Sequence, residues 1–434
     1  MRQLPKNTLW HATTAAGPES RTLQEDLDAE VAIIGGGFLG LSAALRLAEK
    51  GASVILLEAG ELGAGASGRN AGFVVPHFSR AHPAMIQDAL PAQFAERLLR
   101  LVERGGEQVF RLAERIGMGA QAEQSGWLQP AHSPKMAEAL EQRAKEWQQR
   151  GRPVRWMSAS ETHAQTGTSI YHGALSDSSG GMINPLALVR GLARLAMNGG
   201  AQVYTRTPVA CIVPQGGQHV LHTAQGKVVR ADQVIVATNS GTHGAAAELG
   251  RSVLPLQVYQ VATRPLDVET IARIAPNRVP VSDSRTNIFT YRLDAENRLI
   301  SGGMALIPLA AERRMAKRIA TRLATELKLE STPAVEYVWR GTAAVSRDGL
   351  PSVVSMGEKI WGATGCNGRG VAFTNMLGAS LADWVLSGAD PNNAPLPVSP
   401  AAALPFRGLG RMAPSAVLLK AMVADWIRPQ EGQP

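Results

Sequence analysis

The stretch that decides the fold is "AEVAIIGGGFLGLSAALRLAEKGASVILLEAG", residues 29–60. Its apolar run at 31–34 predicts a buried parallel strand. Residues 39–50 predict a helix with its apolar side chains on one face, and the glycine that follows is typical of a helix end. Residues 54–57 predict a second strand. The order strand, helix, strand indicates a βαβ unit.

Three glycines between the first strand and the helix, Gly35, Gly37 and Gly40, form the pattern GxGxxG. The first permits a tight turn, the second lets backbone amides approach a pyrophosphate, and the third lets the helix pack on the strand. Glu58 lies 18 residues after Gly40, where a carboxylate can accept hydrogen bonds from the ribose hydroxyls and repel a 2′-phosphate. The pattern predicts dinucleotide binding; the alternative is a plain glycine-rich turn.

The composition is that of a globular chain. Its 434 residues suffice for two or three domains, and 45% hydrophobic residues allow a large core. The sequence has no run of 18 apolar residues, its first 28 residues have no apolar signal core, and it has two cysteines. We therefore expect a cytoplasmic protein without an integral membrane segment. The net charge of +8 is spread without a long basic block, which disfavours nucleic acid as a partner.

The rest of the chain alternates helical and strand-like segments. We expect helices at 84–118, 134–150, 310–329 and 375–386, strands at 199–213 and 219–239 with a hairpin turn at Gln225 and Gly226, and an antiparallel sheet over 252–306. Residues 391–414 predict an extended tail. Residues 415–428 predict a short closing helix with an apolar stripe around Trp426, which could contact the chain itself, a partner or a membrane.

Nucleotide-binding patterns are thus spread along the chain, a layout that favours a flavoprotein over a simple NAD dehydrogenase. The predicted fold class is α/β (α+β overall), with a Rossmann-like FAD-binding domain interleaved with an antiparallel-sheet substrate domain, as in glutathione-reductase-type flavoproteins. We assign residues 1–85, 155–245 and 335–390 to the FAD-binding domain, 86–154 and 246–334 to the substrate domain, and 391–434 to a C-terminal tail.

Four stretches resemble the D-amino-acid oxidase superfamily of FAD-dependent oxidoreductases, and among them γ-glutamylputrescine oxidase-like proteins. They are "VAIIGGGFLGLSAALRLAEKG" (31–51), "GAGASGRNAGFV" (63–74), "SDSSGGMINPLALVRGLARLAMNGGAQVY" (176–204) and "GCNGRGVAFTNMLG" (365–378). The resemblance covers about residues 25–390. It implies an FAD site formed by Gly35, Gly37, Phe38, Leu39, Gly40, Glu58, Ala59, Gly65, Ser67, Gly68, Arg69, Asn70, Ala71, Gly72, Val209, Ala237, Thr238, Asn367, Gly368, Arg369, Gly370 and Val371.

Four positions depart from the family pattern. Ala343 stands where oxidases of free α-amino acids keep a carboxylate-binding Arg, which puts an ordinary α-amino acid substrate in doubt. Gly341 stands where sarcosine oxidases attach flavin through a Cys, so we expect non-covalent FAD. The stretch "NRLISGG" (297–303) lacks the Lys that activates oxygen, so the acceptor is oxygen or a quinone or other electron carrier. Arg369 replaces the family's His.

The candidate catalytic residues are His77, Tyr291 and Arg292. His77 follows the 63–74 loop and could face the substrate or aid proton removal; the alternative is a structural histidine. Tyr291 could bound the pocket or pack in the core, and Arg292 could bind an anion or be a strand-edge charge. Cys366 fits a small loop residue better than a redox thiol. The histidines show no metal-ligand spacing, so we expect no metal.

The resemblance therefore implies oxidation of a C–N bond in an amine or modified amino acid. Hydride passes to the flavin N5 atom, and water hydrolyses the imine to a carbonyl compound plus an amine or ammonia. The alternatives are oxidation of a hydroxy acid or polyol, or a redox-sensing flavoprotein without turnover. We expect a monomer or homodimer that binds a small amine or amino-acid-like molecule.

Overall fold

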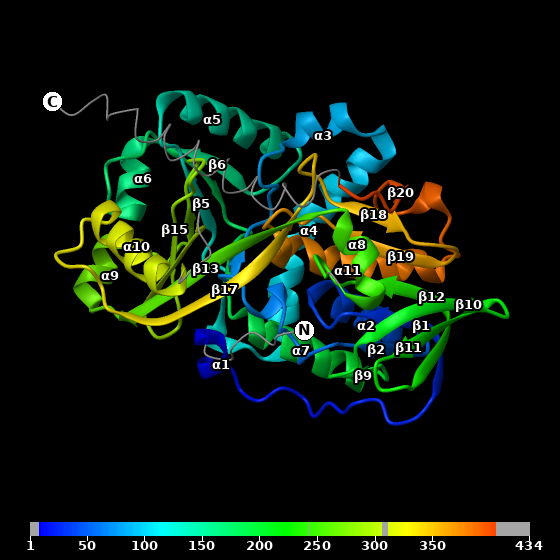
Figure 1. Ribbon diagram of the computed structural model, residues 1–434. Coiled ribbons are helices and arrows are strands. Elements are labelled where there is room, and N and C mark those ends of the chain that lie inside the picture. The colour runs from blue at the N-terminus through cyan, green and yellow to red at the C-terminus, as the bar shows by residue number, and fades with distance from the viewer. Residues whose placement is uncertain (1–7, 242, 306–310, 405–434) are drawn as a thin grey trace.

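The computed structural model describes residues 8–241, 243–305 and 311–404. Within them two large sheets form two lobes (Figure 1). The first sheet has nine strands, seven of them in the order β20-β18-β19-β12-β1-β2-β9. Its members are β1 (Leu27–Ile34), β2 (Val54–Leu57), β9 (Gln202–Tyr204), β10 (Val209–Gln215), β11 (Gln218–Thr223), β12 (Val228–Val236), β18 (Ser352–Ser355), β19 (Ile360–Thr364) and β20 (Val398–Pro400).

The predicted βαβ unit lies at the centre of this sheet. Strand β1 pairs in parallel with β2 on one side and with β12 on the other. Helix α2 (Phe38–Glu49) connects β1 to β2, and ten of its residues are buried. A helix buried nearly all round needs cover on several sides. Helices α4 (Ala92–Ile116), α7 (Pro185–Asn198) and α11 (Gly370–Leu386) complete this helical layer.

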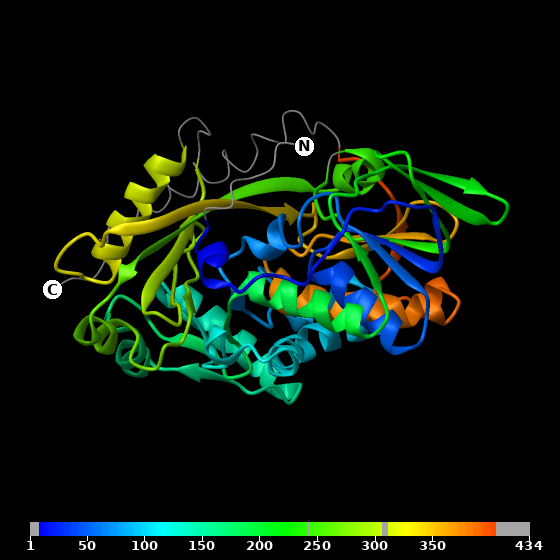
Figure 2. The ribbon, with the colours of Figure 1, turned by 90° about the horizontal axis from the view of Figure 1, so that it is seen from below.

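The contact between α2 and α11 is close because small residues face each other. A Cβ atom on Gly378 would lie 2.3 Å from the carbonyl oxygen of Leu39, so only glycine allows this approach. The Ser42 hydroxyl donates a hydrogen bond of 2.8 Å to Oδ1 of Asn375. Figure 2 shows α7 (green) and α11 (orange) on the same side of the nine-stranded sheet. A C-terminal segment thus completes the surroundings of the N-terminal glycine motif.

The second sheet has eight strands in the order β17-β13-β16-β15-β14-β5-β7-β6 among the described residues. It is antiparallel except for the β14–β5 pair. Helix α10 (Ala311–Glu326) packs on its long strands. Its strands are β5 (Trp127–Pro130), β6 (Val154–Met157), β7 (Ala174–Asp177), β13 (Leu254–Pro265), β14 (Val281–Ser282), β15 (Thr290–Leu293), β16 (Arg298–Gly303) and β17 (Val335–Val345).

A small sheet of β3 (Phe73–Val74), β4 (Ala122–Glu123) and β8 (Gly181–Ile183) stands apart from the two large ones. In Figure 1 the strands β13 and β17 run from the left lobe toward the middle of the molecule. The remaining helices are α1 (Leu9–Thr13), α3 (Pro83–Ala89), α5 (Pro134–Gln149), α6 (Ala159–Thr166), α8 (Ala247–Arg251) and α9 (Val268–Ile274), with short 3₁₀ turns η1 (Ala66–Gly68), η2 (Gly119–Gln121), η3 (Gly244–Ala246) and η4 (Pro391–Asn393).

The mixed α/β fold class predicted from the sequence is confirmed, with a parallel Rossmann-like sheet and a separate, mainly antiparallel sheet. Three strands assigned wholly or mostly to the FAD-binding domain, β6, β7 and β17, lie in the eight-stranded sheet. Strand β20, which was assigned to the C-terminal tail, pairs with β18 of the nine-stranded sheet. The boundaries themselves stay a prediction. Helix α11 begins at Gly370 rather than near residue 375. The predicted helix at 415–428, with Trp426, lies outside the described residues.

Candidate functional site

The glycine motif makes a tight turn at the carboxyl end of β1. Gly35 has φ +113°, and a Cβ atom there would lie 2.7 Å from the Ala237 carbonyl oxygen. A Cβ atom on Gly40 would lie 2.0 Å from the Gly35 carbonyl oxygen, and one on Gly37 would lie 2.8 Å from Oγ of Ser67. The three glycines are therefore required by close approach of the backbone itself and of the 65–72 loop. Gly37 is also the N-cap residue of α2, so the positive end of that helix faces this turn.

Glu58 follows β2 and bridges two backbone segments. Its Oε2 atom accepts a hydrogen bond of 2.7 Å from the Gly36 amide, and Oε1 accepts one of 2.7 Å from the Gly60 amide. Burial raises the pKa of this carboxyl group, and the two amide bonds oppose the rise. Glu58 thus lies beside the glycine turn, as the sequence predicts, and Ala59 lies next to it on the surface.

The 65–72 loop packs on the glycine turn and on the second sheet. Oγ of Ser67 accepts a 3.0 Å hydrogen bond from the Phe38 amide. The buried Arg69 donates through Nε to the Arg340 carbonyl oxygen at 3.0 Å. The Arg69 carbonyl in turn accepts a 3.0 Å bond from the Trp339 indole. These contacts join the loop to β17, one residue from Gly341.

Asn70 and its neighbours give the loop its shape. Nδ2 of Asn70 donates to the Ser67 carbonyl oxygen at 2.9 Å, and Oδ1 accepts from the Gly72 amide at 2.8 Å. The Trp10 indole donates a 2.8 Å bond to the Asn70 carbonyl oxygen. Gly72 has φ +74°, Gly65 is the N-cap of the 3₁₀ turn η1, and Gly68 is its last residue. Every residue predicted from the 65–72 stretch therefore lies in one ordered loop.

The loop that precedes α11 contacts the end of β17. The Asn367 amide donates to the Ala344 carbonyl oxygen at 3.2 Å, and Oδ1 of Asn367 accepts a 2.9 Å bond from the Ser346 amide. Gly368 has φ +82°, which lets the chain turn into the helix at Gly370, and Val371 is buried there. The guanidinium of Arg369 lies 5.2 Å from the centre of the Trp127 ring. Burial, and then the nearby Arg143, lower the pKa of Arg369 to about 10.

Three further predicted positions lie at β12 and β10. The Ala237 amide donates to the Ile34 carbonyl oxygen at 2.8 Å, which extends β12 alongside the glycine turn. The hydroxyl of Thr238 is buried without a hydrogen-bond partner among the described residues. Val209 is buried at the start of β10.

These features fit the FAD that the sequence resemblance implies. The glycine turn leaves no space for side chains but exposes the positive end of α2, and Glu58 and Thr238 place polar atoms beside it. A pyrophosphate at the end of a helix and a ribose beside a carboxylate match these groups chemically.

His77 lies inside the protein, between two tryptophans. Its Nε2 atom is 2.7 Å from Oδ2 of Asp177, and its ring centre is 5.1 Å from that of Trp127 and 5.4 Å from that of Trp147. Burial lowers the pKa of His77 to about 4, against the opposing effect of Asp177. Burial alone would raise the pKa of Asp177, but His77 and Arg152 hold it at about 2. His77 is therefore neutral at pH 7 and bonded to a carboxylate.

Tyr291 and Arg292 are buried on β15. The Tyr291 hydroxyl donates to the Ile274 carbonyl oxygen at 3.3 Å. The Arg292 guanidinium donates to the carbonyl oxygens of Ala71 at 2.5 Å and Ile183 at 3.0 Å, and it lies 5.1 Å from the Trp10 ring centre. These contacts favour packing and bracing roles for both side chains over contact with a substrate.

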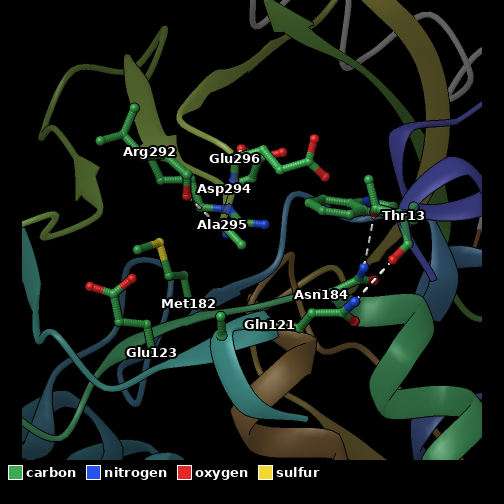
Figure 3. Close-up of a pocket in the computed structure, with 12 residues that line it drawn as sticks. Thr13, Gln121, Glu123, Met182, Asn184, Arg292, Asp294, Ala295 and Glu296 are labelled. Atoms are coloured by element: carbon green, nitrogen blue, oxygen red, sulfur yellow. Dashed lines mark hydrogen bonds between the residues drawn. The ribbon is translucent and has the colours of Figure 1, made fainter. Parts of the chain in front are cut away.

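A cavity of about 60 Å³ lies beside Arg292, between α1 and the turn after β15 (Figure 3). Its polar lining is already hydrogen-bonded: the Gln121 amide donates to the Thr13 carbonyl oxygen at 2.9 Å, and the Asn184 amide to the Thr13 hydroxyl at 3.3 Å. The cavity holds at most a few waters. It is too small for a dinucleotide.

Sequence reasoning missed Asp177, Arg152 and Arg143. Asp177 and Arg152 form a buried ion pair beside His77. Arg143 lies on α5, where its spacing is that of an ordinary amphipathic helix. No local signal distinguishes such an arginine, because its significance comes from contacts made across the fold.

The comparison with protein families gives the class. The family model described as FAD dependent oxidoreductase (DAO) matches residues 30–384. The chain therefore belongs to the DAO family of FAD-dependent oxidoreductases, the amine and amino-acid oxidase family, and the prediction from its four motifs is confirmed.

Individual relatives agree with this assignment. The chain is 29% identical over 402 residues to gamma-glutamylputrescine oxidoreductase of Escherichia coli K12, covering 90% of this chain and 92% of the relative. Among solved structures, glycine oxidase from Geobacillus kaustophilus has a TM-score of 0.68 at 23% identity, covering 83% of this chain and 95% of that one. L-Proline dehydrogenase from P. horikoshii has a TM-score of 0.71 at 17% identity, with coverages of 85% and 97%. These structures share the fold.

The described residues contain neither a membrane-spanning helix nor a cluster of metal-binding side chains. No helix in the described part of the chain is long and apolar enough to cross a membrane. No group of three or more His, Cys, Asp or Glu side chains within residues 8–241, 243–305 and 311–404 could hold a metal ion.

Proposed function

We propose that this protein oxidises the C–N bond of an amine or modified amino acid with FAD held non-covalently. The observation that carries the proposal is the composition of β17 where it reaches the 65–72 loop. Gly341, Thr342 and Ala343 carry neither a cationic side chain nor a thiol, and a Cβ atom on Gly341 would lie only 3.3 Å from the Arg69 carbonyl oxygen. Family membership supplies the reaction class, and β17 restricts the substrate.

The chain's residues divide the binding of FAD among them. Glu58 would accept hydrogen bonds from the ribose hydroxyls, while the amides at the start of α2 would hold the pyrophosphate. Arg69 and the small residues of its loop would lie along the rest of the cofactor. The loop at 367–371 would present backbone amides and the positive end of α11 to the pyrimidine edge. FAD, when bound, accepts hydride from the carbon next to the amine nitrogen.

Amine oxidation of this kind requires little proton transfer by side chains of the protein. His77 is neutral, buried and hydrogen-bonded to Asp177, so its role is to stabilise the packing around Trp127 and not to exchange protons with solvent. A neutral amine needs chiefly to be positioned and desolvated for hydride transfer. The acceptor that reoxidises the flavin is oxygen or a quinone-type carrier.

The test is anaerobic reduction of the flavin by a panel of primary amines, secondary amines, hydroxy acids and polyols. We expect amines to bleach the flavin and to yield an aldehyde or ketone plus ammonia or a smaller amine. Bleaching by hydroxy acids alone would instead assign C–O oxidation. A flavin that no member of the panel reduces, while dithionite reduces it fully, would favour a sensing role.

A further inference from the structure

Two arginines and a tryptophan form a cluster beside the loop that precedes α11. We call Arg369, Arg143 and Trp127 the arginine–tryptophan cluster. Arg369 is the N-cap residue of α11, Trp127 begins β5, and Arg143 lies in α5. Three separate segments of the chain therefore contribute to it, and of the three residues only Arg369 belongs to a loop that is expected to approach FAD.

Arg369 has no counter-ion among the described residues. Its guanidinium lies over the Trp127 ring at 5.2 Å, and the groups that act on its pKa are burial and another cation, Arg143. A guanidinium carries five N–H donors, and stacking on an indole leaves its edge free to donate. A partly buried arginine without an acid is costly unless a ligand supplies the charge.

Arg143 reaches the same region from α5. It lies one helical turn before Trp147, so the two side chains share the helix face that meets His77. Its Nη2 atom donates a long bond of 3.3 Å to the Arg80 carbonyl oxygen, and its buried Nε atom has no partner. The nearby Glu146 already accepts from the His82 ring at 2.8 Å and from the Ala84 amide at 3.2 Å.

Trp127 adds a third donor. It is fully buried, its ring centre lies 5.1 Å from that of His77 and 5.2 Å from the Arg369 guanidinium, and its Nε1–H has no hydrogen-bond partner among the described residues. An indole N–H can only donate. The Nε–H of Arg143 and the indole N–H of Trp127 therefore have no acceptor, and Arg369 has no counter-ion among the described residues, which is a donor-rich composition that suits an oxyanion.

We propose that Arg369 and Arg143 bind an anionic group of the substrate, a carboxylate or a phosphate, with the indole N–H of Trp127 as a third donor. This inference rests on the proposed function. The Arg369 loop is bonded through Asn367 to Ala344, next to Ala343. Ala343 provides no cation at this end of β17. The cluster provides two cations nearby, Arg369 from the adjoining loop and Arg143 from α5.

The first experiment measures anion binding to the oxidised holoenzyme. Glutarate and inorganic phosphate are titrated at constant ionic strength while the flavin absorbance is recorded, with FAD content checked in every variant. We expect Arg369→Gln and Arg143→Gln each to weaken binding of the preferred anion by about 10- to 100-fold, the range for losing a charge-assisted pair. Arg369→Lys should retain part of the affinity.

The matched control is Arg347→Gln, an exposed arginine on the turn after β17. It should bind the anions within about twofold of the unchanged protein, the scale of a surface charge effect. Anion affinities that are equal in the unchanged protein and in both cluster variants would overturn the proposal. So would loss of affinity in Arg347→Gln as large as in Arg369→Gln, since that would report net charge and not a site.

The second experiment separates this inference from the proposed function. Anaerobic flavin reduction is compared for 4-aminobutanoate, 5-aminopentanoate and the uncharged amines of the same chain length. If the cluster binds the anion, Arg143→Gln raises the half-saturating concentration of the amino acids at least 10-fold and leaves that of the uncharged amines unchanged. Equal effects on both series would overturn the inference while leaving amine oxidation intact. No reduction by either series would count against the proposed function.

Discussion

The Nε2 atom of His77 lies 2.7 Å from Oδ2 of Asp177, and both side chains are buried. Arg152 forms an ion pair with the same carboxylate, and two tryptophan rings pack against the imidazole. This pair predicts how stability changes with pH. Folded His77 takes up a proton only near pH 4, whereas the unfolded side chain does so near 6.5. Between these values the unfolded chain binds more protons, so acidification favours unfolding by up to about 3 kcal/mol.

Asp177 affects the stability of the fold at a lower pH than His77 does. Its contribution is present above its ordinary pKa of 3.8 and is lost as the pH falls toward about 2. The measurement is thermal unfolding from pH 8 to pH 4 for the unchanged protein and for His77→Gln, which cannot titrate. The variant should lose less stability across the window, whereas the exposed His172→Gln should follow the unchanged protein. Identical slopes in all three would mean that His77 is not the group responsible.

Glu58→Ala should weaken FAD binding by about 1–3 kcal/mol, because a charge-assisted hydrogen bond to the ribose and the anchoring of the Gly36 and Gly60 amides are both lost. The dissociation constant of FAD for the apoprotein, from flavin fluorescence, measures this. Glu30→Ala is the matched control, since Glu30 is an exposed acid on β1 that accepts from the Ser53 amide at 2.6 Å. Unchanged FAD affinity in Glu58→Ala would remove the ribose role.

The absence of a cysteine at Gly341 predicts that FAD is released by acid precipitation. Neither Cys211, in β10, nor Cys366, in the loop before α11, stands at that position. The supernatant should carry all the yellow colour, and its chromatographic retention should match that of FAD. Colour that stays in the pellet would demonstrate a covalent bond to another residue.

Plain α-amino acids should be poor substrates, because Ala343 cannot pair with a carboxylate next to the amine and an unpaired buried charge costs several kcal/mol. The rates of flavin reduction by D-alanine, glycine and sarcosine are compared with those of primary and secondary amines. Ala343→Arg should improve D-alanine relative to the amines. If D-alanine already reduces the flavin as fast as the best amine, the argument from Ala343 is wrong.

Arg292→Met should destabilise the fold without changing the apparent affinity for the substrate. The change leaves the Ala71 and Ile183 carbonyl oxygens without their donor, at a cost of at least about 3 kcal/mol. Thermal unfolding of the holoenzyme measures the loss, and Arg264→Met, an exposed arginine on β13, should have little effect. If the variant has normal stability but a raised half-saturating substrate concentration, Arg292 contacts the substrate and the structural role is wrong.

The sequence predicted the parts of this site that depend on short-range patterns. Gly35, Gly40 and Glu58 stand at fixed spacings inside one βαβ unit, so their positions follow from local geometry. The surroundings of His77 could not be predicted, because Asp177 and Trp147 reach it from β7 and α5. The role of Arg292 could not be predicted either, because the sequence indicates its strand but not the carbonyl oxygens that its guanidinium binds.

The pairing of β1 with β12, and of α2 with α11, sets the order in which the site can form during synthesis. Residues 29–60 leave the ribosome early, yet the strand beside β1 comes from residues 228–236 and the helix on α2 from residues 370–386. The glycine turn is therefore translated long before Ala237 and α11 exist, and Leu39 and Ser42 lack their contacts with α11 until the chain is nearly complete. A chain that stops before α11 would contain the whole dinucleotide motif and still lack the surface that orders it. Premature termination upstream of residue 370 would leave the apolar face of α2 that meets α11 exposed, and an exposed apolar helix favours aggregation.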